Sequence, residues 1–178
     1  FAQQVDIDKA VSSARKVFEK GHWSNMSPGQ RKKILLKFSQ LIERDRLELS
    51  LLDTIDMGKT INDTYNADLP TSIDNIEWYA EIIDKLFDDI SPSSKEYMGL
   101  ITKEPIGVVA ALVPWNFPVI LASRKISTAL AAGCSVIVKP DVITPGSVME
   151  IVDICREAGV PPGVVNLLSG DPAGISEE

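Results

Sequence analysis

The chain has 178 residues and a mass of 19.4 kDa, with 44% hydrophobic and 24% charged residues. These values are ordinary for globular proteins and exclude a collagen-like or wholly disordered chain. Asp and Glu number 25 against 18 Lys and Arg, which gives a net charge of −7. Such a chain repels phosphate backbones, so we expect no nucleic-acid partner. No apolar run is long enough for a membrane-spanning helix, so we expect no membrane partner.

The cysteine content indicates a reduced protein. Cys134 and Cys155 are too few for a disulfide framework, which favours a cytoplasmic location. Free cysteines are usually buried, so we interpret both as core residues. No spacing of His, Cys or carboxylates is typical of a metal site, and no metal is predicted. Because the first residue is Phe1, we expect the native start to lie upstream.

Apolar spacing predicts a helical first half. Amphipathic helices are expected over 6–20, 28–43 and 47–57, with Asp6 as a candidate N-cap of the first. Ser27 followed by Pro28 is typical of a helix start. The longest helical pattern covers 62–87 and places Leu86 on its inward face. Pro70 predicts a kink or boundary within it.

The second half has a different pattern. Residues 90–104 predict an extended ribbon or hairpin. Short apolar strands at 108–113, 135–138 and 164–168 alternate with helices at 118–132 and 145–158, as in parallel β-α-β-α-β units. The continuous apolar run 108–113 predicts a strand buried on both faces. The predicted fold is therefore α/β: a helical N-terminal half, a short ribbon, and a partial Rossmann-like parallel sheet.

Ligands bind open parallel sheets beyond the carboxyl ends of the strands. Asn116 follows the first strand between aromatic and proline residues, where its amide could donate to a developing oxyanion. The alternative is a local turn, which loop asparagines usually serve. Lys139 ends the second strand and could bind a phosphate or a ribose hydroxyl, or be a solvated surface lysine. The chain has no Gly-x-Gly-x-x-Gly fingerprint and no P-loop, so a nucleotide site here needs another geometry.

Several segments carry a family resemblance. Glu-Pro-Ile-Gly-Val-Val at 104–109, Leu-Val-Pro-Trp-Asn-Phe-Pro at 112–118 and Ala-Leu-Ala-Ala-Gly-Cys-Ser-Val-Ile-Val-Lys-Pro at 129–140 resemble the NAD(P)-dependent aldehyde dehydrogenase superfamily. The Asp-Met-Gly-Lys turn at 56–59 and the helix-to-strand link at 157–166 resemble it too. The match covers nearly the whole chain in the family's order. It favours the functional interpretations of both the asparagine and the lysine.

The resemblance implies roles for particular residues. Asn116 is similar to the family's oxyanion-stabilising asparagine, and Lys139 to the lysine that contacts the adenosine ribose of NAD or NADP. The other implied coenzyme-binding residues lie on the nicotinamide side (Val113, Trp115), on the adenine side (Gly170, Gly174) and beside them (Pro114, Pro140, Asp141). Residues 90–104 correspond to bridging strands, which implies a homo-oligomer. The implied substrate is an aldehyde, oxidised to a carboxylic acid.

Two departures from the family pattern matter. Val142 stands where NAD-preferring members often carry a ribose-binding Glu, which predicts weaker NAD selectivity and use of NADP. The chain stops at Glu178, before the family's nucleophilic Cys and general-base Glu. Domain limits are therefore expected at 1–89 (helical part), 90–104 (bridging strands) and 105–178 (partial coenzyme-binding core), with the catalytic domain absent. We expect a dehydrogenase fragment that is inactive alone; the alternative is a non-catalytic short form that binds nucleotide or serves in assembly.

Overall fold

The arrangement of helices and strands follows the predicted order. A computed structural model describes residues 2–170. The helices are α1 (Gln4–Glu19), α2 (Pro28–Arg44), α3 (Arg46–Met57), α4 (Ile61–Asp63), the π-helical segment η1 (Thr64–Asp68), α5 (Leu69–Ile82), α6 (Pro118–Ala131) and α7 (Gly146–Ala158). The strands are β1 (Asp89–Ser91), β2 (Gly99–Ile101), β3 (Val108–Val113), β4 (Ser135–Pro140) and β5 (Val165–Leu167). No helix within 2–170 combines the length and apolar character needed to cross a bilayer. The α/β fold class is confirmed.

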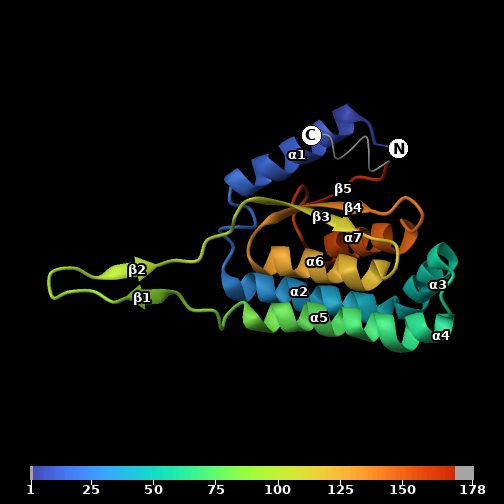
Figure 1. The fold of residues 1–178 in the computed structure, drawn as a ribbon, viewed down its shortest axis with the longest axis horizontal. Coiled ribbons are helices and arrows are strands. Elements are labelled where there is room, and N and C mark those ends of the chain that lie inside the picture. Colours follow the sequence, from blue (N-terminus) through green and yellow to red (C-terminus); the bar gives the residue numbers. More distant parts are fainter. Residues whose placement is uncertain (1, 171–178) are drawn as a thin grey trace.

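A parallel sheet lies at the centre of the second half. Its strand order is β3-β4-β5, with helices α6 and α7 on one face and α1 on the other (Figure 1). Strand β4 is buried along its length. Burial on both faces was a wrong prediction for β3, where Ala110 and Leu112 are exposed. The reason is that β3 is an edge strand and α1 lies mainly over β4 and β5.

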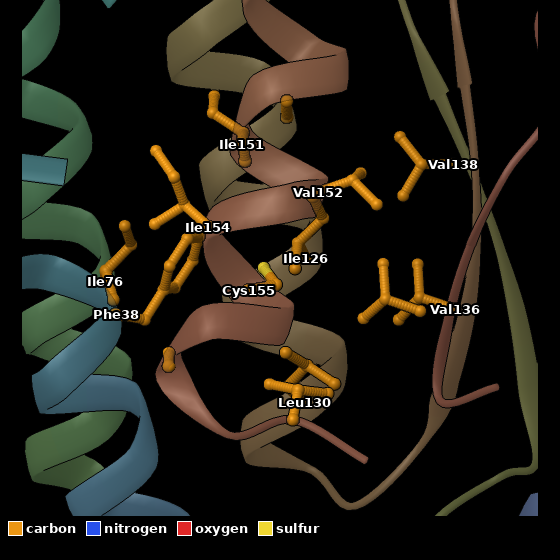
Figure 2. Packing of buried hydrophobic residues seen from close by; sticks show 14 of the residues in the cluster. Phe38, Ile76, Ile126, Leu130, Val136, Val138, Ile151, Val152, Ile154 and Cys155 are labelled. Atoms are coloured by element: carbon orange, nitrogen blue, oxygen red, sulfur yellow. The ribbon is translucent and has the colours of Figure 1, made fainter. Parts of the chain in front are cut away.

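The helical half and the sheet share one core. Helices α2 and α5 pack below α6 and α7 (Figure 1), and Phe38 of α2 and Ile76 of α5 lie beside Ile154 of α7 (Figure 2). Trp23 is fully buried, and its indole N–H donates to the Leu130 carbonyl over 2.9 Å. The helical half and the sheet therefore pack as one body around a common core.

Two helix boundaries differ from expectation. The N-cap of α1 is Gln3, and Asp6 instead accepts a hydrogen bond from the Gln3 backbone N–H at 3.1 Å. Helix α5 ends at Ile82, so Leu86 lies beyond it and is 62% exposed rather than inward. The boundary expected near Pro70 is confirmed, because η1 ends just before it and Pro70 occupies the first turn of α5.

A hairpin separates the two halves. Strands β1 and β2 pair in antiparallel fashion, with Asp89 opposite Ile101, and project away from the body (Figure 1). Its apolar side chains are largely exposed, namely Ile90, Tyr97, Met98, Leu100 and Ile101. The ribbon predicted for 90–104 is thus a hairpin whose apolar surface the rest of the described chain does not cover.

Candidate functional site

The candidate site lies at the carboxyl edge of the sheet. In the register of β3 and β4, Val113 is opposite Pro140 and Leu112 is opposite Lys139. The two strands therefore end level, and their following loops start side by side. Helices α3 and α4 lie at the same end of the molecule (Figure 1). The fold thus brings the loop after β3, the end of β4 and the C-terminal end of α3 to one edge.

Asn116 lies on the loop between β3 and α6. Its side chain is exposed and forms no hydrogen bond with any residue of 2–170. Residues 115 and 116 lie in a turn, but no described backbone group pairs with the Asn116 side-chain amide, so the amide itself does not stabilise that turn. Pro118 at the start of α6 and the strand end at Val113 fix both ends of the loop. The amide is therefore held on a short loop with its donors free.

Lys139 is placed differently from an ordinary surface lysine. Only 8% of the residue is exposed, since it belongs to the fully buried strand β4. No carboxylate or carbonyl of the described chain pairs with its ammonium. A buried stem with an uncommitted cationic end is suited to an external hydroxyl or anionic group. The surface-lysine alternative is wrong for this position.

The other predicted coenzyme residues vary in exposure. Val113 and Pro140 are buried, and Pro114 and Trp115 are exposed. The Asp141 carboxylate accepts the Ile143 backbone N–H at 3.2 Å, a local turn contact. Two further residues complete the set: Gly170 is buried at the end of the described range, and Gly174 lies outside the described residues. The structure therefore brings the residues of β3 and β4 together, and the contacts of these positions with a coenzyme stay a prediction.

A polar network beneath this edge was missed by sequence reasoning. Asp56 of α3 accepts the Gly146 backbone N–H at 2.6 Å, and Asp53 accepts the Ser147 hydroxyl at 2.8 Å. Both carboxylates thus bind the N-terminal turn of α7, where the helix dipole favours negative charge. A β-carbon on Gly146 would lie only 3.0 Å from the Asp56 carboxylate, so a larger residue would require that carboxylate to shift slightly. The partners are at least 90 positions apart, and no local pattern could reveal them.

Asp53 is a strongly perturbed acid. The residue is 1% exposed, and its Oδ2 has no described partner. Burial is the main cause that raises the pKa of Asp53, to about 6, and the nearby Asp68 carboxylate also raises it. The hydrogen bond from Ser147 lowers this pKa, but by less than burial raises it. The carboxyl group therefore titrates close to neutral pH, in contrast to an exposed aspartate.

The cysteines are not suited to nucleophilic chemistry. Cys134 is 2% exposed and Cys155 is fully buried, in the core of Figure 2. Burial raises the pKa of the Cys155 thiol, so the thiolate is disfavoured. The interpretation of both as core residues is confirmed by their burial.

A surface hollow occurs elsewhere in the described chain. It lies between α1 and the free edge of β5 and is lined in part by Asp6, Lys9, Arg156 and Asn166. The hollow reaches Leu168 and Ser169 at the carboxyl end of β5, and its lining includes neither Asn116 nor Lys139.

Comparison with known proteins agrees with this geometry. The aldehyde dehydrogenase family model matches residues 1–178. The NADP/NAD-dependent aldehyde dehydrogenase PuuC of Escherichia coli (strain K12) is 46% identical over 94% of this chain and 34% of its own length. Aminoacetaldehyde dehydrogenase of Pseudomonas aeruginosa is 41% identical over 93% of this chain and 33% of its own.

Solved structures show the same relation. The crystal structure of an indole-3-acetaldehyde dehydrogenase complexed with NAD+ superposes with a TM-score of 0.96 and 41% identity, over 99% of this chain and 36% of that one. The chain thus spans about a third of the length of the relatives it matches. The family model covers the whole chain, and the relatives and solved structures above are aldehyde dehydrogenases of the same fold: the chain belongs to the aldehyde dehydrogenase family.

Proposed function

We propose that this chain is the coenzyme-binding part of an NAD(P)-dependent dehydrogenase that oxidises an aldehyde to a carboxylic acid. One observation carries the proposal: Asn116, on the loop after β3, and Lys139, in the adjacent parallel strand β4, lie at the same sheet edge, each with polar atoms that no described residue satisfies. Buried or fixed polar groups are normally paired, so unpaired groups at a strand edge indicate an external ligand. Nothing in the structure or the comparisons favours the alternative of a non-catalytic short form.

The residues of the chain have distinct tasks in this proposal. The Asn116 amide donates a hydrogen bond to the aldehyde oxygen as negative charge develops on it. The Lys139 ammonium donates to ribose hydroxyls of the coenzyme. Val113 and Trp115 bound the nicotinamide side, with Val113 contributing through its backbone. When bound, the nicotinamide supplies the hydride acceptor. The thiol nucleophile and the general base come from residues beyond this chain.

The organisation of the complete protein follows from the same proposal. Residues 1–89 and 105–178 form one coenzyme-binding unit, supported by the core they share. Residues 90–104 join copies of the protein into a homo-oligomer, supported by the exposed apolar side chains of the projecting hairpin. A cytoplasmic location is supported by the two cysteines, which are both free thiols.

Coenzyme selectivity tests the proposal that the residues just after β4 contact the ribose of the coenzyme. Val142 is 37% exposed and has no charge with which to repel a 2′-phosphate. Val142→Glu in the complete polypeptide adds an acceptor for ribose hydroxyls and a repulsive charge. We expect the ratio of kcat/KM for NAD+ to that for NADP+ to rise about 10- to 100-fold, since hydrogen bonds to charged groups contribute about 1.5–3 kcal/mol. Steady-state kinetics with each coenzyme measures the ratio.

A neighbouring substitution provides the control. Ile143→Glu places the same charge one residue along, at a position that is 60% exposed. It should change the ratio by less than about threefold, because surface charges are screened by solvent. A parent enzyme that already strongly prefers NAD+, or equal responses of the two variants, would contradict the proposed role of Val142.

A further inference from the structure

Lys59 connects a buried acid to the loop that carries Asn116. Its Nζ lies 2.5 Å from Asp68 Oδ2 and 4.1 Å from the centroid of the Phe117 ring. Phe117 directly follows Asn116. The lysine therefore forms an ion pair on one side and a cation–π contact on the other, between α3–η1 and the loop after β3.

The backbone around Lys59 and Asp68 is shaped for this contact. Gly58 ends α3 in the left-handed conformation, with φ of 75°, and turns the chain so that Lys59 leaves the helix. Asp68 closes the π-helical segment η1, in which the Leu69 N–H bonds to the Thr64 carbonyl. π-helical turns are rare and often occur at functional sites. The Asp68 side chain is 6% exposed and that of Lys59 is 20% exposed, so the ion pair is mostly shielded from water.

The loop has few other polar anchors. The side chains of Trp115 and Asn116 form no hydrogen bond with any residue of the described range. Phe117 is the N-cap of α6 and offers no side-chain cap. Phe117 as a residue is 41% exposed, so its contact with Lys59 is not a by-product of deep burial. A small displacement of Phe117 would move the adjacent amide.

We propose that Lys59, anchored by Asp68, is a positioning residue: through Phe117 it sets the place of the Asn116 amide. The role in turnover rests on the proposed function, whereas the effect on the loop does not. Misplacement of a catalytic group by about 1 Å can cost roughly 100-fold in rate. Lys59 thus acts on the reaction without touching the reacting atoms.

A double-mutant cycle in the complete polypeptide tests the role in turnover. Lys59→Met and Phe117→Leu should each lower kcat about 10- to 100-fold and leave the KM for coenzyme within about twofold. The double variant should be no worse than the poorer single variant, because both remove one contact. Lys59→Arg should restore most of kcat, since it keeps the cation and the ion pair. Losses that multiply in the double variant, or no loss in either single variant, would overturn the proposal.

A matched control separates this role from a general ion-pair effect. The Lys32 side chain is also 20% exposed and pairs with Glu81 at 2.8 Å, far from the loop in the fold. Lys32→Met should leave kcat unchanged. An equal loss in Lys32→Met would contradict a specific role of Lys59.

A spectroscopic readout keeps the test independent of activity. In the complete polypeptide labelled with fluorotryptophan, the Trp115 resonance is assigned by its loss in Trp115→Phe. Lys59→Met and Asp68→Asn should shift this resonance, and Lys32→Met should not. A Trp115 resonance unmoved in both variants overturns the inference, even if the parent enzyme is active. An inactive parent with a shifted resonance overturns the proposed function and supports the coupling of Lys59 to the loop.

Discussion

Asn116→Ala is expected to lower kcat of the complete enzyme by about 10²–10³-fold, with KM for coenzyme nearly unchanged. Removing one oxyanion donor from other enzymes costs this much. The reason here is that the amide is held on the short loop between β3 and α6 and serves no described partner within the chain. Its removal should therefore cost transition-state stabilisation and little folding stability. Steady-state rates together with urea unfolding of the variant measure both quantities.

Two companion variants sharpen this result. Asn116→Asp keeps the size of the side chain and removes its donors, so it should lose at least as much rate. Asn62→Ala removes an exposed amide from α4 at the same end of the molecule and should keep kcat within about twofold. If Asn116→Ala kept kcat within a few-fold of the parent, the asparagine would not be the oxyanion donor.

Asp53→Asn is expected to stabilise the protein at neutral pH. The folded-state pKa of Asp53 is raised from 3.8 to about 6, chiefly by burial, so the folded chain binds its proton more tightly than the unfolded chain. The tighter proton binding of Asp53 therefore stabilises the folded state. This stabilisation is complete below about pH 4 and is lost as the pH rises to about 6. At pH 7 the buried carboxylate should cost about 1–3 kcal/mol, which the neutral amide avoids. Urea unfolding at pH 5 and pH 7 measures the difference between variant and parent.

Comparison with an exposed acid isolates the effect. Asp74→Asn makes the same charge change on the exposed side of α5 and should alter the free energy of unfolding by less than about 0.5 kcal/mol. Carboxylates with a lowered pKa, such as Asp45 beside Arg44, make the folded state more stable as the pH rises, which is opposite to the effect of Asp53. They are common to parent and variant, so the comparison between the two proteins is unaffected. An Asp53→Asn protein with the parent's stability and pH dependence would show that the carboxyl group is not desolvated.

Local sequence signals predicted most of the fold. Ser27 followed by Pro28 predicted the start of α2, because helix caps depend on nearby residues. The strands of the parallel sheet were evident from short apolar runs between helical patterns. The exposed face of β3 and the end of α5 could not be predicted from local sequence, since burial at an edge depends on which element covers it.

The site was predictable only in part. Asn116 and Lys139 were predicted as site residues because strand ends are the ligand-binding edge of a parallel sheet and because the motifs around them resemble a family. Asp53, Asp68 and Lys59 were missed as a network. Their partners come from other elements, and a lone acid or lysine in a helical pattern is most often a solvated residue. Only the folded arrangement shows that two buried carboxylates and a partly buried lysine lie close together.

The most direct test of the proposed function is aldehyde-dependent reduction of the coenzyme by the complete polypeptide that carries these residues. Purified protein is mixed with NAD+ or NADP+ and a panel of aliphatic, aromatic and amino aldehydes, and reduced nicotinamide is followed by its absorbance. We predict aldehyde-dependent formation of reduced coenzyme and one equivalent of carboxylic acid. Binding of coenzyme without reduction by any aldehyde of the panel would contradict the assignment and would favour a binding or assembly role instead.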